Sequence, residues 1–304
     1  MSRLPSQTED QYSIHPSTRM GHVALCVSSL DNQVEFYTGA LGIRLNWRSE
    51  KEAGLGTERA DLIRLVEEPA FRRYRGTSGL YHFAILLPDR PELARALARL
   101  LNLGYPNYPT DHVMTKTTYL DDPEGNGIEL YTESPEDGSF SISGDTFVTL
   151  RADGTASSGR EPLDVEALLQ HLRPDDRLDR PVPDSTRIGH VHLHVSDLDA
   201  AIQFYHGVIG FDLMGLSRSF RAAFVSAGGY HHHLGLNTWQ GEGAVPQPAD
   251  ALGLSYFTIL LPDAAELDGV VERVQSSGHP IRQVENGYLT EDPSRNRVRL
   301  ASQQ

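Results

Sequence analysis

The chain repeats itself, and this repetition limits the folds it can adopt more than any other feature. A segment that begins at Gly21 (GHVALCVSSLDNQVEFYTGALGIRL) returns in altered form at Gly189 (GHVHLHVSDLDAAIQFYHGVIGFDL). A second related pair begins at Gly79 and Gly253, and a third surrounds Tyr119 in one copy and Tyr288 in the other. Repeats of this length are typical of structural units that bury their apolar faces against one another. The 304 residues therefore hold two homologous halves, each made of two units.

Every unit shows the same order of secondary-structure signals. An alternating apolar segment, such as residues 22–27, predicts a strand. A Ser-Leu-Asp or Pro-Asp turn then predicts the start of a helix of about 10–15 residues. Short strands follow, separated by Gly and Asp-Pro turns. We predict an α+β protein of four β-α-β-β-β units, in which the third unit ends on a strand at residues 231–239.

Composition shifts along the chain suggest where the halves begin and end. We assign an N-terminal arm (1–18), a first domain with units one and two (19–136), a connector (137–186) and a second domain with units three and four (187–304). The connector is rich in Gly, Ser, Asp and Pro, and only Pro162 to Leu172 favours a short helix. Its length allows units to pair out of their order along the chain.

Charge and cysteine content exclude several classes of function. The net charge of −14 argues against a nucleic-acid partner or an anionic membrane surface. No apolar run approaches the roughly 18 residues of a membrane span, and the polar N-terminus lacks the apolar stretch of a signal peptide. Cys26 is the only cysteine, so no intrachain disulfide forms, and we expect a cytoplasmic protein in which Cys26 is a core residue.

The repeated motifs resemble those of a known superfamily. The Gly-His-Val strand, the Phe-Tyr pairs at 36–37 and 204–205, and the Asp-Pro-x-Gly-Asn turn at 122–126 resemble the vicinal oxygen chelate superfamily. That superfamily includes glyoxalase I, bleomycin resistance proteins and extradiol ring-cleaving dioxygenases. The resemblance covers nearly the whole chain. It implies two half-open barrels, each made of two units, with metal ligands on the inward faces of strands.

A more specific signature lies at residues 110–129. His112, Tyr119, Asp122-Pro123, Gly125 and Glu129 follow one another at the spacings of extradiol dioxygenases, and the resemblance is closest to two-domain bacterial catechol 2,3-dioxygenases. Thr118 departs from that pattern, at a packing position where the family has an aliphatic residue or Phe. The resemblance implies that Glu129 is a metal ligand and that His112 and Tyr119 hydrogen-bond the bound diol.

The internal repeat gives an independent view of the metal ligands. His82 and Glu129 of the second unit correspond to Tyr256 and Arg299 of the fourth. An imidazole and a carboxylate favour a divalent cation, whereas a guanidinium repels one. Two histidines and one carboxylate are typical of non-haem Fe(II) oxygenases, in which the remaining metal positions stay open. The second unit can therefore hold a metal, and the fourth cannot.

The third ligand has two candidates, His190 and His22, each on the first strand of a unit. Sequential pairing of units one and two selects His22, and pairing of units two and three selects His190. We favour His190, because the related enzymes carry a catalytic histidine on the last strand of the unit that donates this ligand. Only unit three has histidines there (231–233), and the family pattern falls on His232.

Strand alternation adds predictions for the remaining histidines. It places His231 and His233 on the face opposite to His232, and it places His192 and His194 on the face of His190. The other three internal candidates, His171, His206 and His279, fall at positions that we expect to be solvated.

The resemblance implies an extradiol dioxygenase that opens a catechol-type ring with O2. Fe(II) would be held by His82, Glu129 and His190, with Mn(II) possible; His232 would be the acid/base group, and we expect a homo-oligomer. Three alternatives stay open: a glyoxalase-type isomerase, a fosfomycin-type thiol transferase and a metal-free binding or resistance protein. The sequence does not specify the substituents of the ring.

Overall fold

The computed structural model describes residues 12–303, apart from the side chain of Ser143. Residues 1–11 of the predicted arm therefore lie outside the described residues. The described part of the arm packs against unit three, since Ile14 is buried and donates its backbone N–H to the carbonyl of Gly210 at 2.7 Å. The predicted β-α-β-β-β order is confirmed in all four units.

Units one and two have one helix and four strands each. Unit one consists of β1 (Arg19–Val27), α1 (Leu30–Gly39), β2 (Arg44–Arg48), β3 (Glu52–Gly56) and β4 (Asp61–Glu67). Unit two consists of β5 (Gly79–Leu86), α2 (Arg90–Asn102), β6 (Tyr108–Asp111), β7 (Thr115–Asp121) and β8 (Gly127–Glu133).

Units three and four repeat this order. Unit three consists of β13 (Arg187–His194), α4 (Leu198–Ile202), a π-helix (Gln203–Ile209), β14 (Asp212–Ser217), β15 (Ala222–Ser226) and β16 (Leu234–Asn237). Unit four consists of β17 (Gly253–Leu261), α5 (Ala264–Ser276), β18 (Ile281–Val284), β19 (Gly287–Glu291) and β20 (Arg297–Ser302). Each helix begins after a side chain that accepts a hydrogen bond from the first turn, namely Ser29, Asp89, Asp197 and Asp263.

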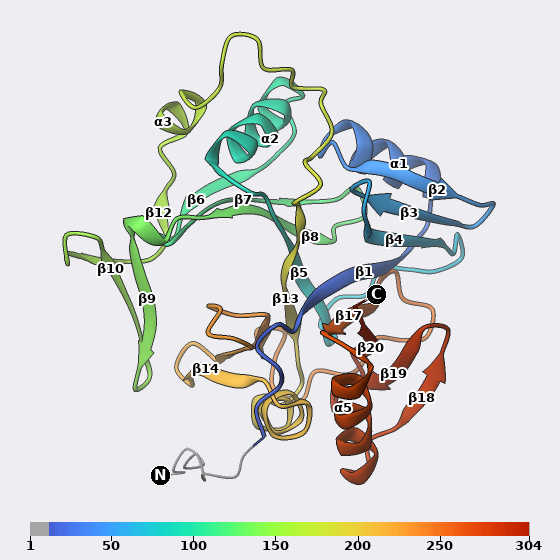
Figure 1. Ribbon diagram of the computed structural model, residues 1–304. Helices are drawn as coiled ribbons and strands as arrows, with labels where there is room; N and C mark the ends of the chain where they lie inside the picture. Colours follow the sequence, from blue (N-terminus) through green and yellow to red (C-terminus); the bar gives the residue numbers. More distant parts are fainter. Residues whose placement is uncertain (1–11, 304) are drawn as a thin grey trace.

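The units pair out of sequence order. A nine-stranded sheet has the order β12-β6-β7-β8-β5-β13-β16-β15-β14, so it joins units two and three through the antiparallel pair β5–β13. An eight-stranded sheet has the order β18-β19-β20-β17-β1-β4-β3-β2 and joins units one and four through β1–β17. Residues 19–136 and 187–304 thus each give one unit to each sheet. The joining strands run through the centre of the molecule (Figure 1), and neither sheet closes on itself.

The connector contains more structure than its composition predicted. A short 3-10 helix (Pro135–Asp137) leads into β9 (Gly138–Ser143), β10 (Thr146–Arg151) and β11 (Ala156–Ser157), which form a separate three-stranded sheet. β12 (Glu161–Pro162) extends the nine-stranded sheet beside β6, and the predicted helix is shortened to α3 (Val165–Leu169). Figure 1 shows β9 and β10 to one side of the larger sheets. Among the described residues, none of the helices is long and apolar enough to cross a lipid bilayer.

Candidate metal centre and its pocket

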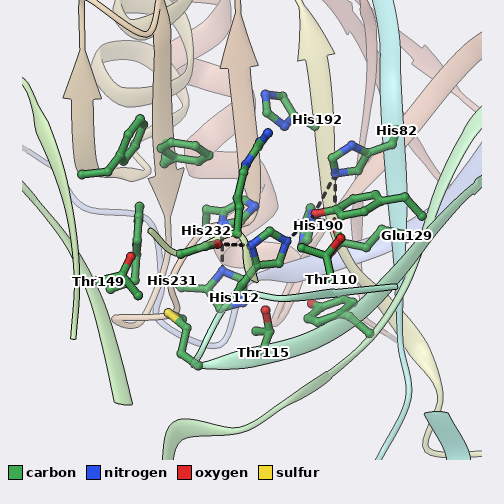
Figure 2. Close-up of a pocket in the computed structure, with 18 of the residues that line it drawn as sticks. His82, Thr110, His112, Thr115, Glu129, Thr149, His190, His192, His231 and His232 are labelled. Atoms are coloured by element: carbon green, nitrogen blue, oxygen red, sulfur yellow. Dashed lines mark hydrogen bonds and ion pairs between the residues drawn. The ribbon is translucent and has the colours of Figure 1, made fainter. Parts of the chain in front are cut away.

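Three side chains of metal-ligating type meet on adjacent strands in the middle of the nine-stranded sheet. Ala84 on β5 is the register partner of both Glu129 on β8 and His190 on β13. His82 precedes Ala84 by two residues, so its side chain leaves the same face of β5. The fully buried methyl group of Ala84 is small, which leaves room for the three larger side chains to turn toward one another (Figure 2).

The nitrogen and oxygen atoms of this group, which we call the triad, lie close together. Nε2 of His82 is 3.2 Å from Nε2 of His190 and 3.2 Å from Oε2 of Glu129. Nε2 of His190 is 3.0 Å from the same oxygen. All three residues are buried. In the part of the chain that the structure describes, no other three His, Cys, Asp or Glu side chains converge in this way.

The charges of the triad suit a cation. Burial acts to raise the pKa of Glu129, but the charge and hydrogen bonds of His190 and His82 hold it well below its usual range. Burial lowers the pKa of His190 to about 4, against the opposing effect of Glu129. At neutral pH the triad therefore presents a carboxylate and an uncharged His190 imidazole, the protonation states that bind metals.

The spacing of the triad fits a divalent metal ion. Three ligand atoms at right angles, each about 2.1 Å from a metal, lie about 3.0 Å from one another, close to the separations measured here. Imidazole and carboxylate ligands suit first-row divalent metals and leave the opposite positions free for other molecules. The residues present thus form a suitable metal site.

His112 and Tyr119 lie beside the triad and contact each other. Nδ1 of His112 is 2.6 Å from the carbonyl oxygen of Gly159. Because a carbonyl only accepts hydrogen bonds, Nδ1 carries the proton, and in the neutral ring Nε2 is left to accept one from the Tyr119 hydroxyl at 2.9 Å. Burial, followed by the charge of Glu129, raises the pKa of Tyr119 well above its usual value, so the hydroxyl keeps its proton.

His232 also lies against the triad, with its ring centroid 4.2 Å from that of His190. Its Nδ1 is 2.7 Å from Nδ1 of His231, whose Nε2 is 3.1 Å from a carboxylate oxygen of Glu133. Burial, followed by the neighbouring histidines, lowers the pKa of His232 well below its usual range. The His232 ring is therefore uncharged at neutral pH.

The prediction that the triple histidine belongs to the last strand of unit three is wrong. β16 begins only at Leu234, and the preceding segment is irregular, so strand alternation does not apply to it. His233 does point away from the pocket, where its Nδ1 accepts hydrogen bonds from the Ser226 hydroxyl and the Ala227 N–H. His231, in contrast, lines the same pocket as His232.

Of the remaining histidines, His192 and His194 lie on β13, and the other three lie outside the pocket. His192 is buried beside His82, with ring centroids 5.1 Å apart, and its Nε2 has no hydrogen-bond partner among the described residues. His194 lies further along β13 and contacts Asn237 at 2.7 Å. His206, which we expected to be solvated, is half-buried with its Nδ1 2.6 Å from the carbonyl of Phe211, and His279 packs on Phe204. His171 is exposed, as predicted.

The triad opens onto a pocket of 660 Å³. The sequence analysis identified Tyr119 and the histidines of this pocket except His231, which it placed on the opposite face, and it missed the walls, which are largely aromatic. These walls come from unit three and the connector, with Phe140, Phe147, Thr149, Arg160, Phe220, Phe224 and Trp239, and from unit two, with Tyr81, Tyr108, Met114 and Tyr131. Figure 2 shows Thr149 of β10 across the pocket from His82 and Glu129. The connector is therefore part of the site.

The equivalent positions in the eight-stranded sheet hold no such group. His22, the alternative third ligand, lies there and has its Nε2 3.0 Å from the hydroxyl of Tyr256. Arg299 occupies the position of Glu129 and donates to the backbone carbonyls of Glu285 and Asn286. Burial, followed by Arg64 and Arg299, lowers the pKa of His22 to about 3. His22 therefore belongs to the other sheet, where Arg64, Arg299 and Asp61 lie near it.

Comparison with known proteins agrees with this architecture. The model of the Glyoxalase/Bleomycin resistance protein/Dioxygenase superfamily matches residues 19–130 and 187–300. The chain therefore belongs to this superfamily.

Comparison with individual proteins gives relatives that are themselves named as dioxygenases. The chain is 40% identical over 284 residues to catechol-2,3-dioxygenase of Bacillus subtilis (strain 168), which covers 92% of this chain and 96% of that protein. It is 27% identical over 139 residues to biphenyl-2,3-diol 1,2-dioxygenase 3 of Rhodococcus globerulus, covering 43% and 73%. The solved structure of glyoxalase I from Zea mays superposes with a TM-score of 0.54 at 17% identity, covering 94% and 92%, and shares the fold.

Proposed function

We propose that this protein is an extradiol ring-cleaving dioxygenase, which opens a catechol-type aromatic diol with O2. The triad of His82, Glu129 and His190 at the end of a large pocket carries this proposal. The 40% identity to a catechol-2,3-dioxygenase over nearly the whole chain supports it. We further propose Fe(II) as the metal, with Mn(II) as the substitute that the same ligands accept, and a homo-oligomeric assembly.

The bound metal would supply a Lewis acid, which lowers the pKa values of the diol hydroxyls and brings O2 next to the ring. The protein residues have separate tasks. The uncharged imidazole of His232 can accept a diol proton and return it later in the reaction. Tyr119, which donates to His112, and His112, fixed by Gly159, would orient the oxygen atoms of the substrate. The aromatic walls exclude water from the reacting ring.

One set of measurements tests the proposed function. Purified protein loaded with Fe(II) should consume one O2 for each catechol, and mass spectrometry with ¹⁸O2 should find both labelled atoms in the ring-opened product. Metal analysis should find one ion per chain. Two other results would replace the proposed dioxygenase with another activity of the fold. One is isomerisation of a glutathione hemithioacetal, and the other is transfer of a thiol to fosfomycin, in each case without O2 uptake. Protein that binds no metal when Fe(II) or Mn(II) is supplied would point to a binding protein.

A further inference from the structure

A carboxylate outside the pocket is connected to His232 through a series of hydrogen bonds. Glu133 lies on β8 four residues after Glu129, so its side chain leaves the same face of that strand. Its Oε1 atom is 3.1 Å from Nε2 of His231, and Nδ1 of His231 is 2.7 Å from Nδ1 of His232. The series therefore leads from the Glu133 carboxylate to a ring that lines the pocket.

The outer end of the series fixes the proton of His231. Burial acts to raise the pKa of Glu133, but the hydrogen bond and charge of His231, followed by a hydrogen bond from Tyr230, hold this pKa below its usual value. Glu133 is therefore a carboxylate at neutral pH, and a carboxylate only accepts hydrogen bonds. The proton in the contact between Glu133 and His231 thus lies on Nε2 of the imidazole. In the neutral His231 ring, Nδ1 then carries no proton.

The contact between the two histidines in turn fixes the proton of His232. One of the two Nδ1 atoms must donate and the other must accept, because they lie 2.7 Å apart. Since Nδ1 of His231 is the acceptor, Nδ1 of His232 is the donor. The uncharged His232 ring has a single proton, so its Nε2 has a free lone pair. This Nε2 forms no hydrogen bond with any described residue, and it is therefore available to a molecule in the pocket.

The surroundings of His231 leave its ring little freedom to turn. Its ring centroid is 4.1 Å from that of Tyr230 and 4.5 Å from that of His232. The Tyr230 hydroxyl donates to the same Oε1 of Glu133 at 2.6 Å and also contacts the hydroxyl of Tyr131. The side chain of His231 is only 9% exposed, whereas that of Glu133 is 33% exposed. The acceptor at Glu133 is thus held in place, and it meets a ring that is packed on both sides.

The direction of these hydrogen bonds decides what His232 can do. A doubly protonated His231 would donate from Nδ1, and Nε2 of His232 would then carry the proton. In that arrangement Nε2 could donate a hydrogen bond to a diol oxygen but could not remove a proton from it. The arrangement with a neutral His231 instead presents a proton acceptor to the pocket.

We propose that Glu133 is a positioning residue for His232, because through His231 it keeps the proton of His232 on Nδ1 and leaves Nε2 as the acceptor toward the bound diol. The consequence for catalysis rests on the proposed function, whereas the location of the proton can be measured without any reaction. The proposal also gives a role to His231, which does not itself need to touch the substrate.

The direct test is the tautomer of His232, measured by long-range ¹H–¹⁵N correlation spectra of the full-length protein with ¹⁵N-labelled histidine. Zn(II), which is diamagnetic and binds the same types of ligand, replaces Fe(II). Signals that disappear in His232→Gln identify the ring. At neutral pH the parent should carry the proton of His232 on Nδ1. Glu133→Leu and His231→Phe should each populate the tautomer with the proton on Nε2, because the acceptor for Nδ1 is then no longer fixed.

Glu136→Leu is the matched control for loss of a carboxylate. Glu136 follows three residues later, is exposed and binds Arg90 rather than a histidine. This variant should keep the parent tautomer of His232. A role of Glu133 in stability alone would lower the melting temperature of Glu133→Leu and leave the tautomer unchanged.

Turnover measures the consequence for catalysis. For O2 uptake with catechol, kcat of Glu133→Leu should fall roughly 10–100-fold, the scale on which outer hydrogen-bond partners act. KM and metal content should stay within about 2-fold of the parent, because Glu133 touches neither the diol nor the triad. Glu136→Leu should keep the parent kcat.

The possible failures are distinguishable. A parent protein with the His232 proton on Nε2, or an unchanged tautomer in both Glu133→Leu and His231→Phe, overturns the inference. Variants that shift the tautomer but keep the parent kcat overturn its catalytic part. If the tautomers behave as expected but the parent turns over no catechol, the positioning by Glu133 holds and the proposed function fails. If circular dichroism shows that Glu133→Leu does not fold, His231→Phe decides the question.

Discussion

At the centre of the nine-stranded sheet His82, Glu129 and His190 converge, whereas the equivalent positions of the eight-stranded sheet hold Tyr256, Arg299 and His22. The two sheets have the same unit order and the same kind of central antiparallel pair. Their central chemistry is nevertheless opposite, because one sheet buries a carboxylate between two histidines and the other places a guanidinium near its single histidine. A shared backbone therefore does not fix the function of the site, and a few side chains decide which sheet can hold a cation.

The largest effect on metal binding and activity is expected from removal of Glu129, the only anionic side chain of the triad. Glu129→Ala should abolish metal binding and activity, because two neutral imidazoles alone hold a divalent cation poorly. The fold should largely persist, since the substitution leaves the strand pairing of β8 unchanged. Metal analysis and circular dichroism check both parts. The control is Arg299→Ala, the same position in the other sheet, which should keep full metal occupancy; full occupancy in Glu129→Ala would refute the assignment.

The two candidate third ligands give the next test. His190→Ala should lose the metal, and His22→Ala should keep it, because the Nε2 of His22 contacts Tyr256 rather than the triad. Metal content per chain after dialysis against Fe(II) distinguishes them. The reverse result would move the metal centre to a pairing of units one and two that the sheets do not contain.

A smaller loss is expected when a proton-transfer group is removed and the metal remains. His232→Ala should retain metal and bind substrate, but lose turnover by roughly 10²–10⁴-fold, the usual contribution of a positioned acid/base group. His233→Ala is a useful comparison, because that neighbour points away from the pocket. Turnover of His232→Ala at the parent rate would transfer the role to another residue.

The smallest predicted effect is on the pH dependence of protein stability, and it arises from His22 in the eight-stranded sheet. The pKa of His22 is lowered to about 3 in the folded protein, against about 6.5 in an unfolded chain. The unfolded state therefore binds more protons between these values, so the contribution of His22 to stability is present above pH 6.5 and is lost as the pH falls. The loss amounts to about 2 kcal/mol at pH 5. Urea unfolding at pH 7 and pH 5 should show that His22→Gln loses less stability than the parent, and equal losses would contradict the role of His22.

Much of the fold follows from local signals in the sequence. The repeats predicted four β-α-β-β-β units, and the capping residues Ser29, Asp89, Asp197 and Asp263 lie where the turns predicted helix starts. The out-of-order pairing of units was favoured only through an argument about His232. No local signal specifies which unit supplies the neighbouring strand, because that choice depends on long-range contacts.

The connector hairpin is the main element that the sequence analysis missed. Phe140 and Ile142 alternate before Gly144-Asp145, and Phe147 and Thr149 alternate after it, which is a hairpin pattern. Its many Ser, Gly and Asp residues instead indicated a linker. Even a correct hairpin prediction would not have placed Phe147 over the pocket, because that position depends on the contacts of β9 and of Asp145 in the turn with β14. Because the segment before β16 is irregular, the argument from strand alternation likewise gave the wrong face for His231.

The exchange of units between the two sheets affects how the chain acquires its structure during synthesis. When residues 19–136 have left the ribosome, β1 and β5 still lack the partners β17 and β13 that follow later in the chain. Central strand edges are thus open during translation, and pairing across such sequence separations is slow and prone to aggregation. Chains truncated after unit two should therefore be insoluble unless the second half is supplied. The activity of this protein depends on both halves being completed together.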